Sequence, residues 1–526
     1  MSILAVLERG RRLATGHPAI VSGENSIGYG DLITAVTEGA RALRARGFGR
    51  GNRVGVMSGN DPTALVAAFS ALAAGATYIP ISAGYRSAEI AATVERFDCD
   101  VLIYHDALSP TIDPVYDQIA TRALLVTIAS GLSNTLRDMS FESLRTEGRA
   151  GAERLPHPRL SDIGWIGLTG GTTGLPKGVE ISWRALYAFI QKFCAEFPAE
   201  HPRMLAAAPL THGAGMLATT VFARGGTLVV TAGVNPPEYL NLVAEQRITE
   251  AFLPPTAIYK LLDFPDIGRY DVSSLKNLIY GAAPSSTRRI REAIRVFGPV
   301  LTQMYGQTEC HTMISVLRPE DHFIGGDING QIAADARLSS CGLPSLGTVV
   351  EIRHDDHVLD VGEVGEICVS SDLAMTGYYH NPEETSKTLR GEFVHTGDVG
   401  YLDAEGYLHI VDRKKDMVIT GGFNVYPAEV EMVLQKRPEI ADCAVLGIPD
   451  DYWGEALIAA VQLVDGTPFD ADTVLAELRD ELGPVKTPKR IVVVDALPQS
   501  AVGKILKTSL RTTLATQING ITDGSR

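Results

Sequence analysis

The sequence contains few cysteines, and it keeps them far apart. Six are present in 526 residues, and no two of them form a CxxC pair. This spacing excludes the paired thiols of a typical zinc site and argues against a disulfide framework. We therefore expect reduced thiols, as in a cytosolic protein, at Cys99, Cys194, Cys310, Cys341, Cys368 and Cys443.

Long apolar runs are also scarce. The most apolar stretch, residues 64–81 (ALVAAFSALAAGATYIPI), is rich in alanine and broken by Gly75 and Pro80. It fits a buried helix running into a buried strand better than a membrane span, which needs about 20 apolar residues. The N-terminal segment becomes charged at residue 8 and lacks the apolar core of a signal peptide. We expect no transmembrane segment and a cytoplasmic location.

Basic residues are outnumbered by acidic ones. The chain has 47 Lys and Arg against 62 Asp and Glu, a formal net charge of -15. A broad nucleic-acid surface requires clustered Lys and Arg that displace counterions from phosphates, so we expect no nucleic-acid partner. This balance does not exclude a local pocket for a nucleotide.

The order of the expected elements predicts several domains of the α/β class, at about 150 residues per domain. Helical and strand patterns alternate over residues 30–145 and again over 205–300, which predicts layered α/β subdomains with parallel strands. Residues 345–411 contain short strands between turn residues, which is typical of a small antiparallel β unit. After Asp412 the charged run DRKKD indicates a linker, and a fresh α/β pattern follows to about residue 510.

We therefore expect a large N-terminal domain over residues 1–412, a hinge over 413–416 and a small α+β C-terminal domain over 417–526. One segment of the first domain carries no such pattern. Residues 319–340 are polar, and we expect a loop there to which we assign no function.

A glycine-rich segment, LTGGTTGLPKG at residues 168–178, carries the clearest chemical signal. The common phosphate loop G-x-x-x-x-G-K-[ST] is absent, because Lys177 follows Gly174 by three residues and precedes Gly178. The segment still offers backbone N–H groups, threonine hydroxyls and one ammonium, which suit a polyphosphate. The alternative is a flexible hairpin between WIGL and GVEIS. We expect ATP contacts from Thr169, Gly170, Gly171, Thr172, Thr173, Gly174 and Lys177.

This segment resembles the signature loop of the adenylate-forming superfamily, which includes acyl- and aryl-CoA synthetases, peptide-synthetase adenylation domains and firefly luciferase. Four more motifs similar to those of that superfamily follow in the same order: YGQTE at 305–309, HTGD at 395–398, DRKKDMVITGGFNVYPAEVE at 412–431 and PQSAVGKILK at 498–507. The likeness runs from about residue 25 to 512. Gly170 departs from the pattern, since the superfamily usually has serine there.

The resemblance implies roles in an adenylation step. Lys504 would bind the incoming carboxylate and the α-phosphate, where an ammonium offsets the repulsion between an anion and a polyanion. Glu309 would hold Mg²⁺, which commonly takes one or two carboxylates plus substrate phosphates, and Thr308 would contact phosphate. Asp398 and Arg413 would bind the ribose. Further nucleotide contacts are expected from Gly281, Ala282, Ala283, Tyr305 and Gly306.

The resemblance also implies a second half-reaction. Rotation of the C-terminal domain about Lys415 would remove the lysine loop and bring Gly421 and Gly422 to a narrow channel for the CoA thiol. The alternative for these glycines is a plain turn between a strand and a helix. His212 would contact the carboxylate or gate the acyl pocket, and its alternative is a structural role.

By the same resemblance, the acid pocket contains small and apolar residues and no acidic one. The absence of a counter-ion for an ammonium argues against an amino acid and favours a neutral acyl or aryl carboxylate, which could be fatty, branched, alicyclic or aromatic. The expected lining residues are Phe252, Gly213, Ala214, Tyr280, Met304 and His311.

Three functions follow from these residues. The leading one is a CoA ligase that uses ATP, Mg²⁺ and a carboxylic acid to form acyl-CoA, AMP and pyrophosphate. The second is an adenylating enzyme that loads a carrier protein, although GGFNVYPAEVE is similar to the CoA-ligase version of that segment. The third is a non-catalytic nucleotide binder, which would not need Lys504. A homodimer is one possible assembly.

Overall fold

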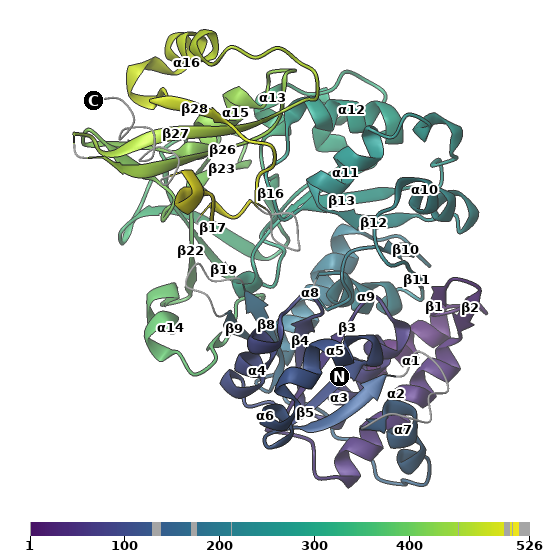
Figure 1. The fold of residues 1–526 in the computed structure, drawn as a ribbon. Helices are drawn as coiled ribbons and strands as arrows, with labels where there is room; N and C mark the ends of the chain where they lie inside the picture. Colours follow the sequence, from purple (N-terminus) through teal and green to yellow (C-terminus); the bar gives the residue numbers. More distant parts are fainter. Residues whose placement is uncertain are drawn as a thin grey trace.

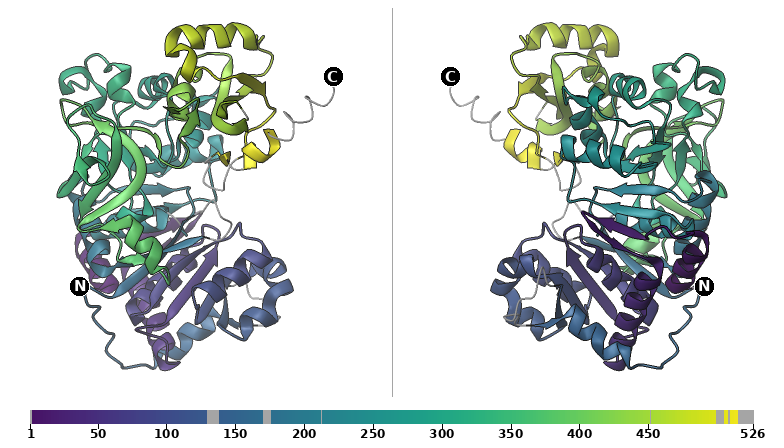
Figure 2. Two further views of the ribbon diagram at one scale, coloured as in Figure 1. Left: turned by 90° about the vertical axis from the view of Figure 1, so that its left-hand side faces the viewer. Right: turned by 90° about the vertical axis from the view of Figure 1, so that its right-hand side faces the viewer.

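The structure is a computed structural model that describes residues 2–128, 138–169, 176–211, 213–450, 452–498, 505–507 and 509–514. Within these residues the chain forms four β-sheets, three before residue 414 and one after it (Figure 1). Figure 2 shows the C-terminal elements gathered at one end of the molecule, opposite the N-terminal helices and strands. The expected α/β class, with a large N-terminal part and a small C-terminal part, is confirmed.

The first sheet has parallel strands at its centre and an antiparallel pair, β8 with β9, toward one edge. Its strand order is β20-β9-β8-β4-β3-β5-β6-β7. The central strands are almost wholly buried because helices cover both faces of the sheet. The strands are β3 Arg53–Ser58, β4 Thr77–Ser82, β5 Val101–His105, β6 Leu124–Ile128, β7 Met139–Ser140, β8 Ile163–Thr169, β9 Lys177–Ser182 and β20 Gly377–Tyr378.

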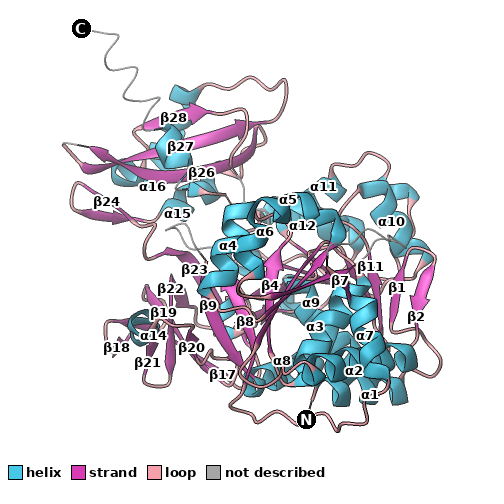
Figure 3. Ribbon diagram, turned by 60° about the horizontal axis from the view of Figure 1, so that its bottom comes forward, coloured by secondary structure: helices cyan, strands magenta, loops and turns pink. Residues whose placement is uncertain are grey.

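Two groups of helices cover this sheet, as Figure 3 shows. One face carries α1 Ile3–Leu13, α2 Tyr29–Ala45, α3 Pro62–Ala74 and α7 Phe141–Arg149, and the other carries α4 Ser87–Arg96, α5 Ser109–Ile112 and α6 Tyr116–Ala120.

The apolar stretch at 64–81 forms a buried helix that leads into a buried strand, as expected. The Asp61 side chain caps the first turn of α3, Pro62 takes its first position, and Gly75 ends it with a φ of 86°. β4 then begins at Thr77. Among the described residues, no helix is both long and apolar enough to cross a membrane.

The second sheet runs in the order β16-β15-β14-β13-β12-β10-β11-β1-β2, and its strands β10 to β14 are parallel. Helices α8 and α9 contribute to the largest apolar core, which both sheets share, and α10, α11 and α12 cover the opposite face. The strands are β1 Ile20–Ser22, β2 Asn25–Ile27, β10 Arg203–Ala206, β11 Thr227–Val230, β12 Glu250–Leu253, β13 Asn277–Gly281, β14 Leu301–Tyr305, β15 Ser315–Leu317 and β16 Leu343–Pro344. The helices are α8 Trp183–Glu196, α9 Gly213–Ala223, α10 Pro236–Glu245, α11 Pro255–Leu262 and α12 Thr287–Phe297.

Residues 319–340 correct the expectation of a polar loop. They form two 3₁₀ turns, at Glu320–His322 and Ile324–Gly326, and the short helix α13 Asp335–Leu338. Phe323 bridges to Ile332, and both pack on the core beneath α11 and α12. The expectation failed because a few scattered apolar residues anchor the segment without producing a periodic pattern.

The third sheet is the small antiparallel unit expected from residues 345–411. It contains β17 Thr348–His354, β18 His357–Val358, β19 Gly365–Ser371, β21 Leu389–Arg390, β22 Phe393–Leu402 and β23 Leu408–Arg413. Helix α14, Pro382–Thr388, precedes β21.

The fourth sheet has cores of its own. Its apolar clusters contain only residues from Val418 onward, so within the described ranges no core is shared with the first three sheets. The elements are β24 Val418–Thr420, β25 Phe423–Val425, α15 Pro427–Leu434, β26 Ile440–Asp450, β27 Gly454–Leu463, α16 Ala471–Lys486 and β28 Arg490–Val493.

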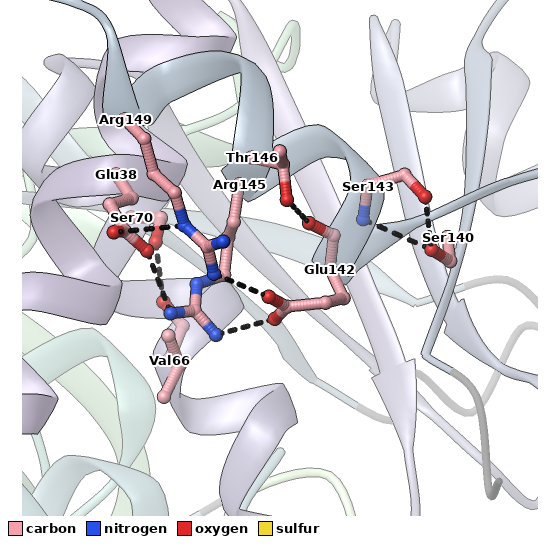
Figure 4. A network of polar contacts seen from close by, with 9 residues as sticks. All are labelled: Glu38, Val66, Ser70, Ser140, Glu142, Ser143, Arg145, Thr146 and Arg149. Atoms are coloured by element: carbon pink, nitrogen blue, oxygen red, sulfur yellow. Dashed lines mark hydrogen bonds and ion pairs between the residues drawn. The ribbon is translucent and has the colours of Figure 1, made fainter. Parts of the chain in front are cut away.

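Helices α2 and α7 pack closely, with an ion-pair network at their edge (Figure 4). The Glu38 carboxylate accepts hydrogen bonds from Arg145 at 2.8 Å and from Arg149 at 3.3 Å, and Arg149 also contacts Glu142 at 2.7 Å. Beneath this network, a Cβ added at Gly148 would lie only 1.9 Å from the backbone oxygen of Glu38. The close crossing of the two helices therefore requires glycine at this position.

We predict that Gly148→Ala destabilises the protein by about 1–3 kcal/mol, because backbone atoms cannot move aside as a side chain can. Thermal denaturation measures the effect. Gly30→Ala in α2 is the matched control, since no atom lies within 4 Å of an added Cβ there. Equal melting temperatures for the two variants would contradict the close packing at Gly148.

Candidate active site

The described ends of the glycine-rich segment belong to the antiparallel strands β8 and β9. Thr169 ends β8, Lys177 begins β9, and the two are paired in the antiparallel register. The Lys177 ammonium forms an ion pair with Glu384 of α14 and lies 5.1 Å from the centre of the Tyr378 ring. Five of the expected contacts lie outside the described residues, namely Gly170, Gly171, Thr172, Thr173 and Gly174.

Glu309 follows β14 in a short 3₁₀ turn, Thr308–Cys310, and its side chain is buried. The Tyr378 hydroxyl donates a hydrogen bond of 2.8 Å to Glu309 Oε1, and no ion pair forms with Glu309 among the described residues. Burial and the Glu309 carboxylate both raise the pKa of Tyr378, so this tyrosine remains a donor. A buried carboxylate with one neutral donor and no paired cation is a suitable ligand for Mg²⁺.

The described residues contain no cluster of three or more metal-ligating side chains. A dedicated protein cage for a metal is therefore absent from this part of the chain. The donor set instead matches Mg²⁺ bound by one carboxylate together with substrate phosphates.

Asp398 joins three of the sequence motifs. Its carboxylate is buried, and it accepts a hydrogen bond of 2.7 Å from the Tyr305 hydroxyl at Oδ2. Its Oδ1 lies 2.7 Å from Arg413 Nε, because β22 and β23 pair Asp398 directly with Arg413. Each carboxylate oxygen has a second acceptor position, so both can still accept a hydroxyl.

The ends of β13 and β14 allow close approach of the backbone. A Cβ at Gly281 would lie 2.2 Å from the backbone oxygen of Met304, and one at Gly306 would lie 2.2 Å from the carbonyl carbon of Thr312. Ala282 adopts a positive φ of 69°, which is uncommon outside glycine, and Ala283 follows it. These residues lie at the carboxyl ends of adjacent parallel strands, where open α/β sheets bind ligands.

Three of the expected pocket residues share one side of the second sheet. Phe252 and Met304 pack on the core shared with the first sheet, and His311 lies against Trp165 and Phe189 of that core. Gly213 and Ala214 begin α9, which lies at the same core.

Tyr280 does not belong with these residues, which corrects the expectation that it lines the acid pocket. Its side chain points to the other face of the sheet, into the core beneath α11 and α12, and its hydroxyl lies 3.1 Å from His322 Nε2. The reason is the alternation of side chains along β13, in which Ile279 faces the shared core and Tyr280 faces away from it.

A narrow apolar cavity adjoins this region. It is enclosed by α3, α8 and α9 and by strands of the first sheet, with Thr211 and Gly215 on either side of position 212. Trp165 and Tyr78 line it from β8 and β4. His212 lies outside the described residues.

The expected hinge begins at Arg413, which pairs with Asp398, an expected ribose ligand. Lys415 is exposed in the turn after β23. Desolvation by the surrounding protein lowers the pKa of its ammonium, and the Asp416 carboxylate partly offsets this effect. Gly421 and Gly422 form the exposed turn between β24 and β25, with φ of 57° and 81°. Lys504 lies outside the described residues.

Sequence reasoning did not select two residues of this site. Tyr378 holds Glu309, and Glu384 holds Lys177. Both come from residues 377–388, which the pairing of β20 with β9 brings to the hairpin. A contact between strands about 200 residues apart leaves no periodic signal in a single sequence, although GYYHNPEET does show the turn and first helical residues of α14.

Comparisons with known proteins agree with this architecture. Residues 7–379 match the profile of AMP-binding enzymes, and residues 429–504 match that of the AMP-binding enzyme C-terminal domain. The chain is 36% identical to medium/long-chain-fatty-acid–CoA ligase FadD8 of Mycobacterium tuberculosis, over 94% of this chain and 87% of that one. It is 32% identical to feruloyl-CoA synthase of an Amycolatopsis species, over 96% and 97%.

A solved structure, that of the amide bond synthetase McbA from Marinactinospora thermotolerans, superposes with a TM-score of 0.87 at 30% identity, covering 97% of this chain and 99% of that one. The profile matches cover most of the chain, and the relatives align over nearly all of it. The protein therefore belongs to the family of AMP-binding, adenylate-forming enzymes.

Proposed function

We propose that the protein is an AMP-forming acid–thiol ligase that converts a carboxylic acid, ATP and CoA into an acyl-CoA, AMP and pyrophosphate. One observation carries this proposal. Two tyrosines join four separate motifs at one place: Tyr305 binds Asp398, which is paired with Arg413, and Tyr378 binds Glu309 and lies beside Lys177. The CoA-ligase names of its relatives support the same reaction.

The first half-reaction forms the acyl-adenylate. A carboxylate oxygen of the acid attacks the α-phosphorus of ATP, a phosphorus–oxygen bond forms, and pyrophosphate leaves with the electrons of the broken bond. Both reactants are anions, so positive charge near the α-phosphate lowers the barrier. We assign this role to Lys504 and phosphate binding to Lys177, while Asp398 and Arg413 orient the ribose.

Mg²⁺ would be held by Glu309 and would offset the negative charge of the triphosphate when bound. The chain keeps this carboxylate available in two ways. Burial limits competition from water, and the Tyr378 hydroxyl fixes the orientation of Glu309. We expect His212, beside the cavity, to contact the carboxylate of the acid or to gate its pocket.

The second half-reaction transfers the acyl group to a thiol. The CoA sulfur attacks the carbonyl carbon of the mixed anhydride, and AMP leaves with the electrons of the broken carbon–oxygen bond. We propose that residues 413–416 act as the hinge and that Gly421 and Gly422 then line the thiol channel. The separate cores of the fourth sheet support this rotation, since among the described residues no apolar core joins this sheet to the first three.

Pyrophosphate exchange into ATP, measured over a panel of acids, tests the first half-reaction. Each accepted acid is then supplied with CoA, with a phosphopantetheinylated carrier protein or with an amine, and the product is identified by mass spectrometry. The CoA ester is the expected product. Exchange without the CoA ester, but with carrier loading or amide formation, would assign another acceptor, and exchange with no acid would leave nucleotide binding alone.

We predict that Lys504→Ala abolishes pyrophosphate exchange while thioester formation from supplied acyl-adenylate and CoA is largely retained. The loss of one preorganised contact to developing charge costs about 2.7–4 kcal/mol, or roughly a hundredfold or more in rate. The two half-reactions are measured separately on the same preparation. Equal losses in both would contradict the use of different sites for the two steps.

We predict that Tyr378→Phe raises the Mg²⁺ concentration needed for half-maximal exchange by about tenfold, because a hydrogen bond to a charged group contributes about 1.5–3 kcal/mol. A magnesium titration at saturating acid measures this effect. Tyr379→Phe is the matched control, since the Tyr379 hydroxyl bonds to Asp98 instead of Glu309. The same magnesium dependence in both variants would show that Tyr378 does not position a metal ligand.

A further inference from the structure

The strand β8 leads from the nucleotide loop to a buried group of polar side chains. Successive side chains alternate between its two faces, so Thr169, Gly167 and Trp165 share one face. At Gly167 there is no room for a side chain, because an added Cβ would lie 2.6 Å from Thr308 Cγ2. Four residues at about 3.3 Å each place Trp165 roughly 13 Å along the strand from Thr169.

His311 is packed at that distance from the loop. Its ring lies edge-on to Trp165, with centroids 6.0 Å apart, and edge-on to Phe189 of α8, at 4.9 Å. Only 2% of His311 is exposed.

Polar atoms in this region lack partners. Within the part of the chain that the structure describes, His311 Nε2, Trp165 Nε1 and Thr312 Oγ1 are buried and make no hydrogen bond. Such atoms are rare in folded proteins, because each costs about 1–3 kcal/mol when it is left unsatisfied. Two of them belong to the rings that contact each other, which indicates a common missing partner.

The backbone at this point is also strained. His311 and Thr312 are consecutive residues with positive φ, at 42° and 66°. Neither is glycine, and such conformations cost of order 1–3 kcal/mol each. The strain accompanies the tight packing of Thr312 against Gly306, so it fixes His311 directly behind the YGQTE motif.

Trp165, which His311 contacts, also lines the cavity described above. Its other walls are mostly apolar, including Leu65, Phe69 and Met216. A ligand with an apolar body and one polar tip would pack against the apolar walls and form hydrogen bonds with the unpaired atoms. An indole N–H is a donor only, so the tip must offer an acceptor. The described residues that line the cavity include no charged side chain, so the lining offers no partner for an ionised tip.

We propose that the acid bound by this protein carries an uncharged oxygen, a ketone or a hydroxyl, far from its carboxylate, and that His311 and Trp165 bind it. This inference rests on the proposed function and names the substrate class of the same site. Under it, His311 is a specificity residue that contacts the substrate at a distance from the reacting atoms.

Matched pairs of acids test the proposal. The pairs are cyclohexylpropanoate with its ring ketone, phenylpropanoate with its para-hydroxy derivative, and octanoate with its keto derivative at the penultimate carbon. For each pair, kcat/KM for pyrophosphate release is measured with the wild-type protein. We expect the oxygenated member of at least one pair to be preferred by roughly tenfold or more, since unpaired buried polar groups penalise the acid that lacks the oxygen.

His311→Phe should remove most of that preference by lowering kcat/KM for the oxygenated acid while the oxygen-free acid is used as well as before or better. Trp165→Phe is a second variant that removes the indole donor and retains an aromatic ring. Tyr280→Phe is the matched control, because it removes a buried hydroxyl on the opposite face of the same sheet and should leave the ratio unchanged.

The outcomes separate the two proposals. Turnover of acids with no preference for oxygen in any pair would overturn the substrate inference and leave the ligase function standing. Equal loss for both members of a pair in His311→Phe and Trp165→Phe would show a structural role only, with buried water as the missing partner. No pyrophosphate release with any acid would instead count against the ligase function itself.

Discussion

The carboxylate of Asp398 is the interaction on which the geometry of the site depends. It is buried, and a buried charge is stable only when its partners satisfy it. Those partners are the Tyr305 hydroxyl at the end of β14 and the Arg413 guanidinium at the end of β23. One group therefore ties the second sheet to the third and to the first residue of the hinge. Glu309 lies four residues beyond Tyr305, so the same contact also determines where the candidate metal ligand stands.

The hairpin of β8 and β9 relates the proposed nucleotide end of the site to the proposed acid end. Thr169 and Lys177 pair at one end of the hairpin, and further along β8 Gly167 lies against Thr308 and Trp165 against His311. Under the proposed function, the nucleotide would bind at one end of β8 and the acid would lie alongside the same strand. In this arrangement the backbone of β8 sets the distance between the reacting carboxylate and the deep end of the cavity. Side-chain motions would change that distance little.

The sequence predicted local features of the fold better than its long-range packing. Local chemistry is visible in the residues themselves: Pro62 and Gly75 bound α3, and the run 412–416 marks the passage to a new core. Long-range contacts leave no such mark. The alternation along NLIYG is plain, but it does not say which face meets the acid, and Tyr280 was therefore assigned to the wrong one. Phe323 and Ile332 anchor the segment 319–340 through an isolated β-bridge, which no hydrophobic periodicity in the sequence indicates. Tyr378 and Glu384 reach the site only because β20 pairs with β9.

The ion pair between Lys177 and Glu384 has a consequence for nucleotide binding and for product release. The Glu384 carboxylate occupies the lysine that we propose binds phosphate. If Lys177 binds phosphate, an arriving nucleotide would displace the Glu384 carboxylate from the lysine. A triphosphate would compete better than a monophosphate, because its greater negative charge interacts more strongly with the ammonium. When pyrophosphate departs, Glu384 can return to the lysine and compete with rebinding. Glu384, in the first turn of α14, would then compete with pyrophosphate for Lys177 and favour release of the product.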